Sequence, residues 1–100
     1  MLDASMNGDK GAPSPVLSCA ARAACALHAR PAARLVQAVQ AFDAELVVIR
    51  GKNRANAKSI LEILALSVQE GDWLELEACG ADAGAALEAL STLFASGFEE

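Results

Sequence analysis

The chain has 100 residues, a net charge of −5, 54% apolar residues and 21% charged residues. This length suits one domain with a modest core, and the apolar content excludes a disordered chain. No apolar run has the length needed to cross a bilayer, so a membrane-spanning protein is not expected.

The first 15 residues are predicted to form a flexible tail. Gly11, Pro13 and Pro15 interrupt the chain there, and the segment has no hydrophobic periodicity. Residues 16–100 are predicted to form the folded domain. Its first strand is expected from Val16 to about Ala23, although the many alanines of this stretch would also suit a helix.

A helix is predicted from about Ala29 to Ala41. Its apolar positions recur at helical spacing and give one buried face, made of Ala32, Leu35, Val36 and Val39. A β-hairpin is predicted next, with strands over 45–50 and 54–58 that are joined by a turn at Gly51-Lys52-Asn53.

A short helix is predicted to begin at Ser59, which forms a capping box with Glu62. This helix is apolar nearly all round. One side, with Ile63, is expected to enter the core, while the other is offered to a partner.

Period-two alternation over 72–78 predicts the last strand, with Leu74, Leu76 and Ala78 pointing inward. A final helix is predicted to bury Leu87, Leu90 and Phe94 and to end at Gly97. The element order is therefore β-α-β-β-α-β-α. This order favours an α+β fold of two layers, with a four-stranded, mostly antiparallel sheet and helices on one face.

Cysteine and charge patterns add two expectations. Cys19, Cys25 and Cys79 have neither metal-ligand spacing nor a paired framework, so reduced thiols in a cytoplasmic protein and no metal site are predicted. Residues 16–58 carry seven Lys or Arg against two acids, whereas 59–100 carry nine acids and no Lys or Arg. The asymmetry indicates either ordinary solvated charge or a basic docking face for acidic partners.

The only histidine, His28, stands where the first helix begins, in the segment Leu27-His28-Ala29-Arg30-Pro31-Ala32-Ala33. A helix N-terminus favours an anion and disfavours an imidazolium, and a phosphoryl acceptor needs a neutral ring. Arg30 is predicted to bind the oxygens of the transferred phosphoryl group, and Pro31 fits the first turn of the helix. The alternative is a histidine that only caps the helix.

This segment resembles the active-site motif of HPr, the histidine-containing phosphocarrier family of the bacterial phosphoenolpyruvate-dependent sugar phosphotransferase system. A second block, Asn56-Ala57-Lys58-Ser59-Ile60-Leu61, places Ser59 31 residues after His28, which matches the regulatory serine of the family. The ending Ser96-Gly97-Phe98-Glu99-Glu100 is also similar to HPr C-termini. The resemblance covers roughly 16–100 and implies an open-faced sandwich.

The resemblance implies a monomeric carrier that accepts a phosphoryl group from enzyme I at Nδ1 of His28 and passes it to IIA domains. It implies no cofactor, no nucleic-acid or membrane partner, and no catalysis by the protein itself. Ser59 matches a site of HPr kinase/phosphorylase. The resemblance implies an apolar docking patch on the second helix, made of Ile60, Leu61 and Leu64. The charge asymmetry predicts a basic docking rim around His28, made of Arg30, Arg34 and Lys58.

Two other functions stay open at this point. One keeps the chemistry and changes the circuit, either to a nitrogen-related regulatory phosphorelay or to an HPr module of a multiphosphoryl protein. The other is a binding module that transfers no phosphate and acts through Ser59. Because His28 and Arg30 are both present, a transferring protein is favoured.

Overall fold

The computed structural model describes residues 15–98, which form four strands and three helices. In chain order they are β2 (Leu17–Arg22), α1 (Ala29–Val39), β3 (Glu45–Arg50), β4 (Asn53–Asn56), α2 (Ile60–Ala65), β5 (Trp73–Cys79) and α3 (Ala83–Ser96). The predicted element order is confirmed. The predicted tail falls on residues 1–14, outside the described part of the chain, except for Pro15.

The four strands form one sheet in the order β2-β5-β3-β4, and each neighbouring pair is antiparallel. The last strand of the chain therefore lies between the first two. Ala78 of β5 is opposite Leu17 of β2 on one side and Leu46 of β3 on the other. This arrangement places the first and last strands of the chain side by side.

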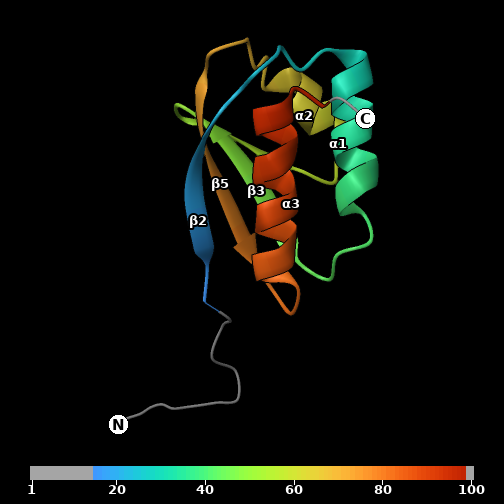
Figure 1. Ribbon diagram of the computed structural model, residues 1–100, viewed down its shortest axis with the longest axis vertical. Helices are drawn as coiled ribbons and strands as arrows, with labels where there is room; N and C mark the ends of the chain where they lie inside the picture. Colours follow the sequence, from blue (N-terminus) through green and yellow to red (C-terminus); the bar gives the residue numbers. More distant parts are fainter. Residues whose placement is uncertain (1–14, 99–100) are drawn as a thin grey trace, which may run out of the picture.

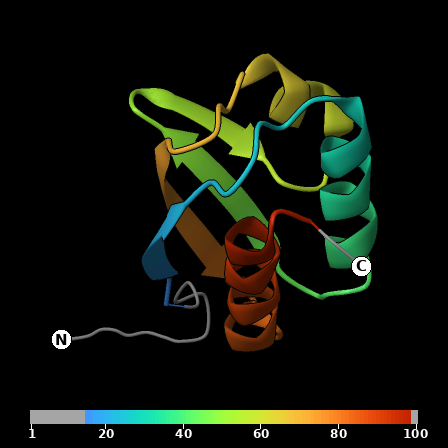
Figure 2. The ribbon, with the colours of Figure 1, turned by 45° about the horizontal axis from the view of Figure 1, so that its top comes forward.

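All three helices cover the same face of the sheet, as Figure 1 and Figure 2 show from two directions. Alternate strand residues point into the layer between sheet and helices, and the helices fill it with large apolar side chains. The core includes Leu46, Val48, Leu74 and Leu76 from the strands and Leu35, Val39, Ile63, Leu90 and Phe94 from the helices. The opposite face of the sheet is open, which confirms the open-faced α+β sandwich.

The alanine-rich first strand forms as predicted, against the helical tendency of its residues. It pairs with β5 along its whole length, and this pairing outweighs weak local propensity. By contrast, β4 ends at Asn56, two residues earlier than predicted. There the Asn56 carbonyl and side chain accept the N–H groups of Ser59 and Lys58, and the chain turns into α2.

Glycines occupy the two positions where backbone geometry requires them near α3. Gly97 has φ +73° and ends the helix, as predicted. Gly80, with φ +130°, precedes the helix in a tight contact with the loop between α1 and β3. A Cβ on Gly80 would lie 2.9 Å from Cα of Ala44.

Candidate functional site

The imidazole of His28 lies at the N-terminus of α1. The backbone of His28 is extended, and its carbonyl accepts the first helical hydrogen bond from Ala32, at 3.0 Å. His28 occupies the N-cap position of the helix, but its side chain makes no capping hydrogen bond. The ring is exposed, and the structure gives it no hydrogen-bond partner within residues 15–98. It is free to meet another molecule.

The first turn of α1 supplies the surroundings that the sequence predicted. Pro31 is buried in the third helical position, where a missing N–H removes no helical bond. The N–H groups of Ala29 and Arg30, like those of any helix start, have no partner within the helix. The guanidinium of Arg30 is exposed and has no ion-pair partner in the described chain. An anion held at His28 would meet these donors.

A shallow pocket of about 220 Å³ opens beside the ring. Three different parts of the chain line it: the segment before α1, the first turns of α1, and residues 97–98 after α3. Figure 1 shows that the C-terminal end of α3, from which residues 97–98 follow, lies beside the N-terminal end of α1. The lining residues are Cys25, His28, Arg30, Pro31, Arg34, Gly97 and Phe98.

Gly97 and Phe98, which follow α3, are anchored on both sides of this pocket. The Phe98 ring is buried and meets the Phe94 ring edge-on, with centroids 5.3 Å apart. Arg34 Nη1 donates to the Phe98 carbonyl at 2.7 Å, and Cys25 Sγ lies 3.4 Å from the Gly97 carbonyl oxygen. The site is thus a composite of α1 and the turn after α3.

Burial raises the pKa of the Cys25 thiol above its ordinary value, and the nearby Glu70 carboxylate raises it further. The thiol is therefore protonated at neutral pH and donates its proton toward the Gly97 carbonyl. Sequence reasoning did not place Cys25, Gly97 or Phe98 at the site. The only available signal was the similarity of 96–100 to HPr C-termini, which does not indicate what those residues touch.

Ser59 is the N-cap of α2, as predicted, and its Oγ accepts the N–H of Glu62 at 3.3 Å. The second half of the expected capping box differs. The Glu62 carboxylate accepts the N–H of Asn56 at 2.9 Å instead of the N–H of Ser59. Glu62 therefore connects α2 to the outer edge of β4.

The apolar side chains of α2 divide between core and surface. Ile63 is fully buried, as predicted, and Leu64 is half-buried. The side chains of Ile60 and Leu61 are exposed, and Leu61 is 77% accessible. We call Ile60, Leu61 and Leu64 the α2 apolar surface.

The predicted basic rim around His28 is not assembled as expected. Arg34 lines the pocket, but its guanidinium is engaged by the Phe98 carbonyl. The Lys58 ammonium donates to the carbonyl of Phe42, beyond the C-terminal end of α1. An 11-residue helix is about 16 Å long, so Lys58 lies at the opposite end from His28. The place of Lys58 next to Ser59 in the sequence did not predict this, because neighbouring positions carry no information on the direction of a side chain.

Disulfides, metal ligands and membrane-spanning helices were sought in residues 15–98, the described part of the chain. Within residues 15–98 no disulfide links the three cysteines, and no three His, Cys, Asp or Glu side chains gather where they would hold a metal ion. None of the helices in this part is long and apolar enough to cross a membrane.

Comparison with known proteins agrees with the fold and identifies the family. Residues 21–96 match the family model described as the PTS HPr component phosphorylation site. The chain is 46% identical over 74 residues to phosphocarrier protein HPr of Treponema pallidum, which covers 74% of this chain and 84% of that protein. It is 40% identical over 75 residues to phosphocarrier protein NPr of Escherichia coli, covering 74% and 83%.

A solved structure of HPr from Bacillus anthracis superposes with a TM-score of 0.76, at 32% identity, over 79% of this chain and 96% of that one. The family-model match over residues 21–96 includes His28, the three helices and strands β3, β4 and β5. The chain therefore belongs to the HPr family of phosphocarrier proteins of the phosphotransferase system.

Proposed function

We propose that His28 accepts a phosphoryl group from phosphorylated enzyme I and passes it to IIA domains of sugar permeases. The observation that carries this proposal is the exposed His28 ring at a helix N-terminus, with no hydrogen bond to occupy either nitrogen within the described residues. Both enzyme I and IIA domains would reach the same ring in turn. The protein acts as a stoichiometric cytoplasmic carrier and performs no turnover of its own.

In the proposed step the lone pair of Nδ1 attacks phosphorus while the bond from phosphorus to the donor breaks. The electron pair of that bond leaves with the donor, and the proton of the neutral ring stays on Nε2. No general base is needed because Nδ1 carries no proton at the start. The phosphoramidate formed retains a high transfer potential, so the reverse sequence delivers the group to a IIA domain.

Arg30 is proposed to hold the transferred oxygens. Its guanidinium lies on the first turn of α1 and lines the same pocket as His28. Planar N–H donors suit phosphoryl oxygens, and the free N–H groups of the helix start add a second set of donors.

Docking is proposed to use the α2 apolar surface, with Arg34 at the edge of the pocket. Ser59 is proposed as a site of regulatory phosphorylation by an HPr kinase/phosphorylase. Its hydroxyl is half-buried but stands at the start of the helix that carries Ile60 and Leu61. A phosphate there would add negative charge to the docking face and weaken binding of an acidic enzyme I.

A test uses phosphoenolpyruvate, purified enzyme I and the protein. The wild type is expected to acquire one acid-labile phosphate, and a His28→Ala variant with unchanged circular dichroism is expected to acquire none. Equal acid-labile labelling of both proteins would contradict the proposal.

A nitrogen-related regulatory phosphorelay is a second candidate, because the chain is also similar to an NPr protein. The chemistry at His28 would be the same and only the donor and acceptor would differ. Phosphorylation rates with enzyme I of the sugar system and with its nitrogen-related counterpart distinguish the two. The faster donor identifies the circuit.

A further inference from the structure

The segment that delivers His28 is held by a second loop. Three backbone hydrogen bonds join the segment 23–28 to the loop 67–72, which connects α2 to β5. Leu27 donates to Val68 at 3.0 Å, Ala23 donates to Asp72 at 2.9 Å, and Gly71 donates to Ala23 at 2.8 Å. Leu27 directly precedes His28 and is buried. The position of the imidazole therefore depends on the shape of 67–72.

That loop is not regular structure and contains two residues with positive φ, Ser67 at +57° and Gly71 at +90°. A serine in this conformation is strained, so the loop needs contacts that hold it. Its own backbone provides one, from Asp72 N–H to the Gln69 carbonyl at 3.1 Å. A second backbone bond joins the Ser67 N–H to the Leu64 carbonyl at 3.2 Å, and side chains add further contacts.

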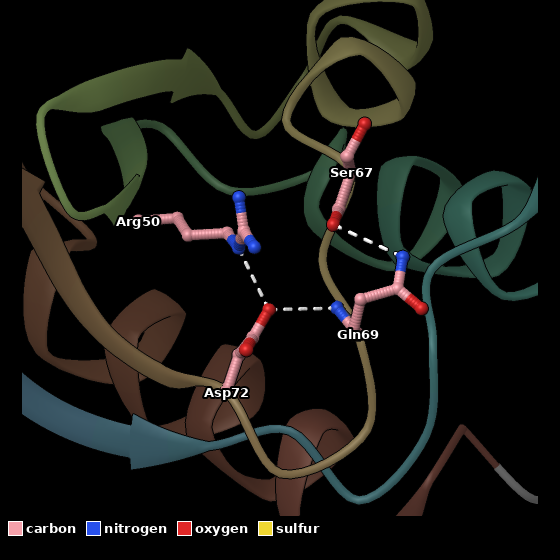
Figure 3. A network of polar contacts seen from close by, with 4 residues as sticks. All are labelled: Arg50, Ser67, Gln69 and Asp72. Atoms are coloured by element: carbon pink, nitrogen blue, oxygen red, sulfur yellow. Dashed lines mark hydrogen bonds and ion pairs between the residues drawn. The ribbon is translucent and has the colours of Figure 1, made fainter.

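One carboxylate oxygen makes the two short contacts drawn in Figure 3. Oδ2 of Asp72 accepts the backbone N–H of Gln69 at 2.8 Å and the Nε–H of Arg50 at 2.7 Å. The Gln69 side chain in turn donates to the Ser67 carbonyl at 3.2 Å. Arg50 is the last residue of β3, so the carboxylate joins the loop to the rigid sheet.

We propose that Asp72 and Arg50 are positioning residues for His28. They fix the loop 67–72, and the loop fixes the backbone of Ala23 and Leu27 on either side of the turn that enters α1. Neither residue touches the proposed phosphoryl group. The part of this inference that concerns transfer rests on the function proposed above, whereas the part that concerns the loop stands on the hydrogen bonds alone.

A matched control exists on the other face of the sheet. The ion pair between Arg54 and Glu77 has a similar N···O distance, 2.9 Å, and a similarly accessible carboxylate. It joins β4 to β5 and has no contact with either loop. If the loss of any surface ion pair were enough to open the loop, removing the Glu77 carboxylate would have the same effect as removing the Asp72 carboxylate.

The experiment compares Asp72→Ala with Glu77→Ala. Amide hydrogen exchange of Leu27 and Ala23 is measured together with urea unfolding, so that local opening is separated from global stability. Losing one of the anchoring hydrogen bonds corresponds to roughly a fivefold to tenfold faster local exchange. We expect this increase at Leu27 and Ala23 in Asp72→Ala, and less than a twofold increase in Glu77→Ala.

Asp72→Asn guards against a variant that does not fold. Its side-chain oxygen still accepts the Gln69 N–H, so it is expected to restore most of the protection. If Leu27 and Ala23 exchange no faster in Asp72→Ala than in Glu77→Ala, the loop does not depend on Asp72 and the proposal is wrong.

The kinetic measurement is the rate of phosphorylation by phospho-enzyme I at saturating and at limiting concentrations of the protein. In Asp72→Ala, kcat is expected to fall about tenfold, because a displaced nucleophile is poorly aligned, while KM changes less than twofold. Faster exchange with an unchanged kcat would also overturn the positioning role. If the wild type accepts no phosphate, the proposed function fails, and the exchange experiment still decides whether Asp72 holds the loop.

Discussion

At the scale of single residues, the proposed site depends on which side chains already have hydrogen-bond partners and which do not. His28 and Arg30 lie on the same helical turn without partners in the described chain, whereas Arg34 and Lys58 are bound to backbone carbonyls. An unoccupied ring and guanidinium can turn toward a phosphoryl group without breaking an existing hydrogen bond. The cations already engaged would first have to give up a short hydrogen bond.

Replacing Arg30 tests its proposed contact with the phosphoryl oxygens. Arg30→Ala is expected to lower kcat of phosphorylation by about tenfold to a hundredfold, since a charge-assisted hydrogen bond contributes about 1.5–3 kcal/mol. Arg30→Lys should recover part of the rate, because it keeps the charge but loses the planar pair of donors. Stopped-flow phosphotransfer would measure both. A pure KM effect in Arg30→Ala would contradict a role in transfer.

The Asp72 carboxylate predicts how stability changes in acid. The Gln69 N–H, and then the Arg50 guanidinium, lower its pKa in the folded protein. The unfolded chain therefore binds the proton more readily. The stabilisation is complete above the unfolded pKa and is lost as pH falls through the folded pKa, within about pH 5 to pH 2.

Urea unfolding across that range would measure this effect. Asp72→Asn is expected to lose less stability than the wild type between neutral and acid pH. If the free energies of unfolding of the two proteins instead change in parallel with pH, Asp72 has the same pKa in the folded and the unfolded chain, and the prediction is wrong.

At the scale of elements, helix ends and the connections between elements determine the geometry of the site. The end of α3 contributes two carbonyl groups to the His28 pocket, and the loop before β5 holds the entry to α1. These contacts join residues that are far apart in sequence. They involve backbone atoms, which have no sequence signature, so periodicity and motif analysis did not predict them.

Gly80 tests one of these close connections. Gly80→Ala would place a Cβ 2.9 Å from Cα of Ala44, in a backbone conformation that side chains rarely adopt. We expect a loss of about 2 kcal/mol or more in the free energy of unfolding. Gly51→Ala is the control, because it also has positive φ but no atom within 4 Å of the added Cβ. Equal losses would mean that the close approach has no effect of its own.

Ser59→Asp tests the regulatory proposal at the start of α2. Aspartate is itself a good N-cap, so the free energy of unfolding should stay within about 0.5 kcal/mol of the wild type. Phosphorylation by enzyme I should nevertheless slow, mainly through a higher KM, because negative charge is added beside Ile60 and Leu61. Ser59→Asn keeps the cap without the charge and should transfer normally. Unchanged kinetics in a folded Ser59→Asp protein would count against regulation at this residue.

At the scale of the whole molecule, sequence patterning predicted the order of elements and a two-layer α+β fold, and the resemblance to HPr implied the open-faced sandwich. The order of elements, the inward face of β5, the burial of Leu90 and Phe94 and the stop at Gly97 are confirmed. Leu87, which was predicted to be buried, is only half-buried. The strand order β2-β5-β3-β4 depends on long-range pairing and was not predicted in detail. At the site, the position of His28 at a helix start is confirmed, and its role as phosphoryl acceptor stays a prediction. The directions of Arg34 and Lys58 depend on tertiary hydrogen bonds and could not be read from their positions in the chain.

The most direct test of the central claim is to locate the phosphate on the isotope-labelled protein by ³¹P and ¹⁵N NMR after treatment with phosphoenolpyruvate and enzyme I. The account predicts a single phosphorus coupled to Nδ1 of His28, with Nε2 protonated and the backbone spectrum of the sheet unchanged. A phosphate on Nε2, on a serine, or on no residue at all would contradict it.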